Sequence, residues 1–200
     1  MTDSQMPAII KETSSGTVCY RIQDAMFMRR EITLFGEITQ ESASACIMQL
    51  QYLETQSADE EITLYINSSG GDVTAGLALY DVMQAVKCPI HTVCIGMAAS
   101  MGAILFTAGN IRDIMPHARI MIHDPHLGHG VTGDAMHLSD ISKDLLAMRR
   151  VLGLILARHA KKKLQEIYKA TQKDTWFNAQ EAVKFGLADK IIYEMRGTSK

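Results

Sequence analysis

Residues 61–71 read EITLYINSSGG, and residues 90–103 read IHTVCIGMAASMGA. Each segment begins as a β-branched run typical of a buried strand and ends in glycine and other small residues. Apolar residues at helical spacing follow each segment, and two further short β-branched runs occur at residues 31–35 and 119–123. Strands that alternate with helices in this way predict an α/β fold with a largely parallel sheet.

The composition indicates a folded domain without a dominant charge. Of 200 residues, 47% are hydrophobic and 21% are charged, which is enough apolar material to form a core. Twenty Lys and Arg oppose 22 Asp and Glu, so a partner that is a nucleic acid or an anionic membrane surface is not expected. No apolar run is long enough to span a bilayer and no secretory signal is visible. The four cysteines lack C-x-x-C spacing. We therefore expect a cytoplasmic protein with reduced thiols.

The chain reads as one domain with an N-terminal arm. Residues 1–18 are polar and rich in small side chains, which predicts a flexible arm before a single domain at residues 19–200. Residues 134–160 carry apolar side chains at alternating steps of three and four, which predicts a long amphipathic helix. Its apolar seam packs either on the domain's own sheet or, as we favour, on another subunit.

Two loops after predicted strands hold candidate catalytic groups. In residues 67–71, NSSGG, paired glycines allow a positive φ and direct backbone N–H groups at an anion, although a plain tight turn also fits. No Gly-Lys-Ser/Thr follows, which excludes a Walker nucleotide site. Ser100 lies among small residues before an apolar helix, as a nucleophile on a sharp strand-to-helix turn requires. A helix-capping serine is the alternative.

A histidine at the end of another strand is the candidate base. His123 closes the run RIMIH, where an imidazole can reach a serine on a neighbouring loop, although a structural histidine is also possible. An acid must orient such a base, and periodicity cannot choose among the carboxylates available. The candidates are Asp113, Asp124, Asp174, Glu181 and Asp189.

A metal site is the competing interpretation of the histidine-rich segment. The potential ligands are His117, His123, His126, His129 and His137 with Asp124 and Asp134. No pair has H-x-x-x-H spacing and no cysteine lies nearby in sequence. We therefore expect no bound metal, and we interpret His126 and His129 as exposed loop residues.

Taken together, these motifs resemble the proteolytic subunit of the Clp protease family (ClpP), a family of serine peptidases. The resemblance extends from about residue 9 to residue 193. It rests on IKETSSG, LYINSSGGDVTAG, IGMAASMGAILFTAG, HARIMIHDP and WFNAQEAVKFGLADKI in this order. It implies a crotonase-like α/β head with a protruding handle built from a strand and a long helix at about 134–160.

The resemblance also implies an activity and the residues that carry it. By position, Ser100 matches the nucleophile, His123 the general base and Asp174 the acid of the triad. Gly71 and Met101 match the oxyanion-hole donors, and Gly70 matches a substrate-binding position. The implied reaction is hydrolysis of unfolded polypeptides through an acyl-enzyme, with no cofactor or metal.

The implied particle is a chamber of two stacked heptameric rings. An AAA+ unfoldase, which alone uses ATP, would feed it with unfolded protein substrates. Residues 11–16 match an axial pore loop, and residues 1–7 match either a removable propeptide or a simple disordered tail.

Several positions depart from the family pattern. Ser69 replaces a proline beside the substrate-binding Gly70, Asp124 replaces a glutamine, the loop 126–133 is slightly longer, and Asp134 replaces an uncharged residue. Since neighbouring strand residues point to opposite faces, we expect Asp124 to face away from Ser100. Two alternatives stay open. One is a noncatalytic or partner-dependent ring subunit, and the other is a crotonase-type acyl-CoA enzyme, which needs no such triad.

Overall fold

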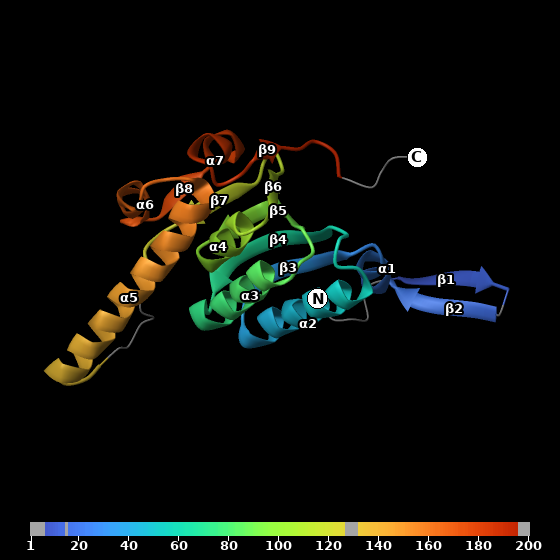
Figure 1. The fold of residues 1–200 in the computed structure, drawn as a ribbon, viewed down its shortest axis with the longest axis horizontal. Coiled ribbons are helices and arrows are strands. Elements are labelled where there is room, and N and C mark those ends of the chain that lie inside the picture. The colour runs from blue at the N-terminus through green and yellow to red at the C-terminus, as the bar shows by residue number, and fades with distance from the viewer. Residues whose placement is uncertain (1–6, 15, 127–131, 196–200) are drawn as a thin grey trace.

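The computed structural model describes residues 7–14, 16–126 and 132–195 (Figure 1). The strands in these residues are β1 (Ala8–Thr13), β2 (Gly16–Arg21), β3 (Glu31–Ile38), β4 (Ile62–Gly71), β5 (Ile90–Ala99), β6 (Ile111–Ile114), β7 (Arg119–Ile122), β8 (Thr175–Phe177) and β9 (Lys190–Ile191). The helices are α1 (Ile22–Met28), α2 (Gln40–Gln56), α3 (Val73–Ala85), α4 (Met101–Thr107), α5 (Ala135–Ala160), α6 (Leu164–Thr171) and α7 (Ala179–Phe185).

The main sheet is parallel except at one edge. Its order is β3-β4-β5-β6-β9, and every pair in this path is parallel. The first half of β5 pairs with β6, whereas its last residues pair with β7, which in turn pairs antiparallel with β8. The predicted α/β class is therefore confirmed. Near its end, β5 stops pairing with β6 and pairs with β7 instead.

Helices α2, α3 and α4 pack on one face of this sheet, as Figure 1 shows. The central strands β4, β5 and β7 are buried at several consecutive positions, as expected for strands covered on both faces. Leu50 of α2, Leu79 of α3 and Phe106 of α4 are fully buried, as are Leu64 and Ile66 of β4. This packing gives the ends of β4 and β5 a rigid support.

Local sequence signals determine where several helices begin. Thr39 accepts a hydrogen bond from the Ser42 amide at the start of α2, and Asp72 accepts one from Ala75 at the start of α3. Asp134 caps α5 in the same way by accepting a hydrogen bond from His137 N–H at 2.9 Å. The charged residue at position 134 therefore has a local role in starting the long helix.

The N-terminal region differs from the prediction of a flexible arm over residues 1–18. Strands β1 and β2 form an antiparallel hairpin with Ala8 opposite Arg21. Figure 1 shows this hairpin extending away from the body, at the opposite end from α5. The composition of residues 1–18 suggested a flexible arm, but two exposed strands can satisfy each other's backbone groups by pairing. Residues 1–6 lie outside the described residues.

The handle agrees with the prediction in its helix, whereas the segment expected to supply its strand falls partly outside the described residues. Helix α5 projects from the head, and its bounds match the helix expected at about 134–160 (Figure 1). Residues 123–126 and 132–134 form no strand, and residues 127–131 lie outside the described part of the chain. The lengthened loop 126–133 is therefore only partly described. None of the helices among the described residues is both long and apolar enough to cross a membrane.

Candidate active site

Ser100 lies at a sharp turn between β5 and α4. Its φ of 53° and ψ of −122° are unusual for a residue with a side chain, and such strain is a feature of nucleophile turns. Ser100 precedes α4, but its side chain makes no capping hydrogen bond. The helix-capping alternative therefore does not account for this serine.

The Ser100 hydroxyl instead contacts the imidazole of His123. The distance from His123 Nε2 to Ser100 Oγ is 2.8 Å. Strand pairing explains this approach, since β5 and β7 are in register at Ala99 and Met121 and Ser100 N–H donates to Met121 O at 2.9 Å. The two side chains are thus brought together by a parallel pairing between segments separated by 23 residues.

Strand register also selects Asp174 as the partner acid. Strands β7 and β8 are antiparallel with Ile122 opposite Thr175, so the next pair along is His123 and Asp174. The distance from His123 Nδ1 to Asp174 Oδ1 is 3.3 Å. The His123 side chain is 13% exposed and that of Asp174 is 68% exposed, so solvent reaches the acid far more than the base.

The environment of His123 lowers the pKa of its imidazole below the ordinary value. The main cause is burial, which disfavours the charged form. Asp174 acts in the opposite direction, and the neighbouring His126 adds to the lowering. A lowered pKa keeps this imidazole neutral, and able to accept a proton, at neutral pH.

The other candidate acids are bound elsewhere. Asp113 contacts His91, Asp124 contacts Arg149 and Thr171, the Glu181 carboxylate accepts from the Asn178 amide, and Asp189 pairs with Arg112. Geometry therefore resolves a choice that sequence periodicity left open.

Asp124 is held by side chains of α5 and α6, and it lines the same cavity as Ser100 and His123. Its Oδ2 accepts a hydrogen bond from Arg149 Nε of α5 at 2.6 Å, and its Oδ1 accepts one from the Thr171 hydroxyl at 2.5 Å. The Arg149 guanidinium also lies over the ring of Tyr168, 3.9 Å from its centroid. Asp124 therefore links α5 and α6 to the segment that follows β7.

The glycine segment lies directly beside Ser100. Residues 67–71 extend β4 and do not form the tight turn that we considered, with φ of 95° at Gly70 and 149° at Gly71. A Cβ built on Gly70 would lie 2.6 Å from Ser100 Cβ and 3.1 Å from Met101 N. Gly71 follows, paired with Ile38 of β3, and Met101 begins α4, where helical amides lack partners within the helix. The backbone of Gly70 therefore lies against Ser100 and the Met101 amide.

A cavity of about 30 Å³ adjoins the serine and the histidine. Its apolar lining comes mainly from α3, α4, β7 and α5 and consists of Val73, Met101, Ile104, Ile122, Leu152 and Leu156. Such a cavity can receive a small apolar side chain beside the Ser100 hydroxyl.

Among the residues that the structure describes, no three His, Cys, Asp or Glu side chains are grouped so that they could hold a metal ion. His137 is the third residue of α5 and His117 is exposed before β7, while His129 lies outside the described residues. His126 is exposed as expected, but its ring packs against His123 with centroids 5.0 Å apart.

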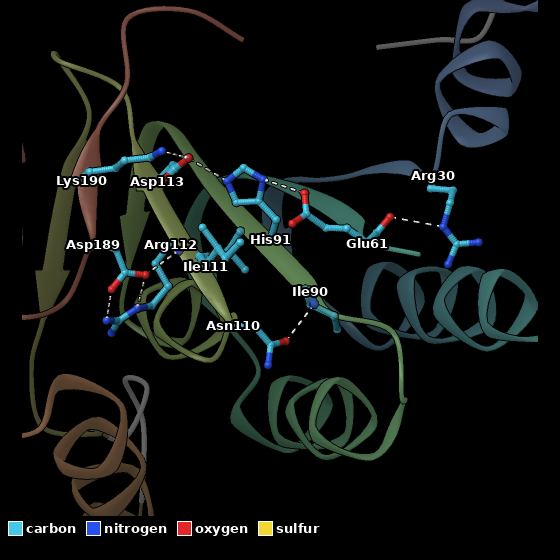
Figure 2. Close-up of polar contacts among 11 residues, drawn as sticks. Arg30, Glu61, Ile90, His91, Asn110, Ile111, Arg112, Asp113, Asp189 and Lys190 are labelled. Carbon is cyan, nitrogen blue, oxygen red and sulfur yellow. Dashed lines mark hydrogen bonds and ion pairs between the residues drawn. The ribbon is translucent and has the colours of Figure 1, made fainter. Parts of the chain in front are cut away.

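Sequence reasoning missed a second histidine–acid pair. His91 Nε2 of β5 lies 2.9 Å from Asp113 Oδ2 of β6, and both side chains are buried (Figure 2). Glu61 and Lys190 flank the pair, at 3.4 Å from His91 Nδ1 and 4.0 Å from Asp113 Oδ2 (Figure 2). The signal was a histidine near the start of the apolar run 90–95 and an aspartate inside the short strand IRDI.

The chain was also compared with models of known protein families. A family model described as Clp protease matches residues 14–195. The match includes every strand of the main sheet, the long helix α5, and the three side chains Ser100, His123 and Asp174.

Proposed function

Since the chain belongs to the Clp protease family, we propose that it is a serine endopeptidase subunit that cleaves unfolded polypeptides into short peptides. The observation that carries the proposal is the 2.8 Å contact between Ser100 Oγ and His123 Nε2, on a serine held in a strained turn. A hydroxyl is a weak nucleophile alone and requires a base within hydrogen-bond distance. The same contact supports a peptidase over a crotonase-type acyl-CoA enzyme, which does not need it.

In the proposed reaction, His123 removes the proton of the Ser100 hydroxyl as Oγ attacks the peptide carbonyl carbon. The oxyanion is stabilised by the Gly71 and Met101 backbone N–H groups. The imidazolium then protonates the leaving amine and an acyl-enzyme remains on Ser100. A water molecule, deprotonated by His123, hydrolyses this ester and restores the serine.

Asp174 stabilises the imidazolium that forms on His123 and selects the tautomer with a proton on Nδ1. The 3.3 Å distance and the high exposure of Asp174 support a weaker orienting effect than a buried acid would give. The cavity beside Ser100 would hold an apolar side chain of the substrate, and Gly70 would lie along the substrate backbone.

The family implies assembly with Clp ATPases in general. The specific proposal is a chamber of two stacked heptameric rings fed by an AAA+ unfoldase. Exposed apolar residues on α5 support subunit contacts along the handle, namely Met136, Leu138, Leu146, Val151 and Leu154. ATP would be used by the unfoldase alone, and the peptidase reaction would need no cofactor. The free thiols Cys46, Cys88 and Cys94 fit a reducing compartment such as the cytoplasm.

A fluorophosphonate probe tests the nucleophile directly. The assembled wild-type particle is expected to be labelled at Ser100, and Ser100→Ala is expected to remain unlabelled with an unchanged unfolding midpoint. Casein cleavage is measured in parallel with and without an AAA+ unfoldase and ATP.

The outcomes separate the possible roles. Labelling together with unfoldase-dependent casein cleavage supports the proposal. Labelling without cleavage under either condition would favour a partner-dependent ring subunit. An assembled particle that is not labelled would contradict the serine mechanism.

A further inference from the structure

The imidazole of His123 has a second imidazole beside it. The rings of His123 and His126 meet edge to face, with centroids 5.0 Å apart and an interplanar angle of 63°. Pro125 lies between the two histidines in sequence and restricts the backbone that joins them. The His126 side chain is exposed, so it can exchange protons with solvent while it contacts the buried partner.

The two ring nitrogens of His123 are already committed. Nε2 faces Ser100 and Nδ1 faces Asp174, so His126 meets the ring without competing for either nitrogen. The proposed mechanism assigns no task to His126. The proposed reaction therefore gives no reason for the His126 ring to pack against His123.

We propose that His126 is a positioning residue whose ring packs against His123 and whose positive charge, at acid pH, keeps His123 in its neutral form. The proposal rests on the proposed function, in which His123 is the base. Two like charges at this separation repel each other, so a proton on His126 disfavours a second proton on His123.

Two carboxylates around His123 act against this effect, and Asp174 raises the pKa of His123 more than His126 lowers it, so His126 modulates the protonation of His123 and does not set it alone. Asp174, before β8, attracts a proton to His123 but is 68% exposed and screened by solvent. Asp124 adjoins His123 in sequence, but its carboxylate is bound by Arg149 of α5 and the Thr171 hydroxyl. The direction of the His123 pKa agrees, since His126 contributes to its lowering.

The test is the pH dependence of fluorophosphonate labelling at Ser100 in the assembled particle. His126→Gln removes both ring and charge, His126→Phe keeps a ring without charge, and His126→Lys keeps a charge without the ring. Below the midpoint of the pH–rate curve, we expect Ser100 in the Gln and Phe variants to be labelled about two- to fourfold more slowly than in wild type. At alkaline pH, where labelling no longer changes with pH, the rates should be equal. The Lys variant should retain the wild-type acid limb. His117→Gln, at the opposite end of β7, is the matched control and should change nothing.

Two results would overturn the inference. One is an acid limb that is the same in wild type and all His126 variants. The other is a uniform loss at every pH in His126→Gln that His126→Phe restores, because that pattern reports packing alone. If wild type is not labelled at any pH, the proposed function fails. The titration of His123 observed by ¹³C-histidine NMR in wild type and His126→Gln then decides the inference, since an unchanged midpoint contradicts it.

Discussion

Two histidine–aspartate pairs lie at this sheet, and one of them contacts a serine hydroxyl. The His91 and Asp113 side chains are 1% and 0% exposed, and His91 Nε2 lies 2.9 Å from Asp113 Oδ2. The His123 and Asp174 side chains are 13% and 68% exposed, and His123 Nδ1 lies 3.3 Å from Asp174 Oδ1. The tighter and more buried pair is the one without a nucleophile. Distance and burial between a histidine and an acid are therefore poor guides to function by themselves.

What differs is the partner of the other ring nitrogen and the place along the strand. His91 Nδ1 faces the carboxylate of Glu61, and His91 lies near the beginning of β5 (Figure 2). His123 Nε2 faces a hydroxyl, and His123 follows the last residue of β7. The comparison shows that a base needs a free nitrogen at a strand end, where a loop can bring a nucleophile to it.

The largest expected effect is the loss of peptide hydrolysis when His123 is replaced. His123→Ala should lower peptide hydrolysis by at least about 10⁴-fold, because the Ser100 hydroxyl loses its proton acceptor. The measurement is kcat/KM on a fluorogenic peptide, with the unfolding midpoint as a control for folding. Activity within tenfold of wild type would contradict the assignment of the base.

A change in the buried pair should affect stability and leave the chemistry intact. Asp113→Ala leaves His91 buried without its acid and should lower the free energy of unfolding by about 3–5 kcal/mol. Urea unfolding at fixed protein concentration measures this loss. Replacing both residues with leucine should recover much of it, because no buried charge then remains unpaired. A loss of labelling at Ser100 in a folded Asp113→Ala protein would show that the two pairs are coupled.

Replacing Asp174 tests how strongly the acid beside His123 supports the proposed reaction. Asp174→Asn should reduce kcat/KM by about 10- to 10³-fold, which is less than the effect of replacing a buried triad acid. The reason is that solvent screens a carboxylate with 68% exposure. A loss as large as that of His123→Ala would indicate that assembly or substrate buries Asp174.

Comparing alanine substitutions at two glycines distinguishes the effect of backbone strain from that of steric crowding at Ser100. Gly70→Ala places a Cβ against Ser100, whereas Gly36→Ala meets nothing within 4 Å, although φ is 95° at Gly70 and 84° at Gly36. Both should lose about 1–3 kcal/mol of stability from strain. Gly70→Ala alone should also slow labelling at Ser100. Equal labelling rates in the two variants would show that Gly70 does not support the nucleophile.

The smallest expected effect is a shift in pH dependence. Burial lowers the pKa of His123 below its ordinary value of 6.5, so the fraction of neutral base stays high until the pH falls below that value. The acid limb of kcat/KM should therefore lie below the usual histidine range, with full activity at neutral pH. An acid limb above pH 7 would contradict the lowered pKa.

The sequence predicted most elements and the residues of the candidate site, but not the contacts between them. The strands at 31–35, 61–66, 90–95 and 119–123 were legible because apolar and β-branched residues recur at short range. The hairpin of β1 and β2 was not predicted, because its residues are almost all exposed and no buried apolar alternation marks the two strands. The extension of β4 through Gly71 was missed because glycines usually mark a turn.

Local patterning by itself determined the α/β class, the long helix and the two places where Ser100 and His123 end up. Periodicity left the acid beside His123 open and the family resemblance pointed to Asp174, but only tertiary structure brings Asp174 to His123, because their contact depends on the register between β7 and β8, two strands far apart in the chain. Tertiary structure also decided that Asp124 binds Arg149 and that His91 pairs with Asp113. Sequence periodicity encodes which face a residue occupies, whereas the partner across that face is determined only when distant segments pack together.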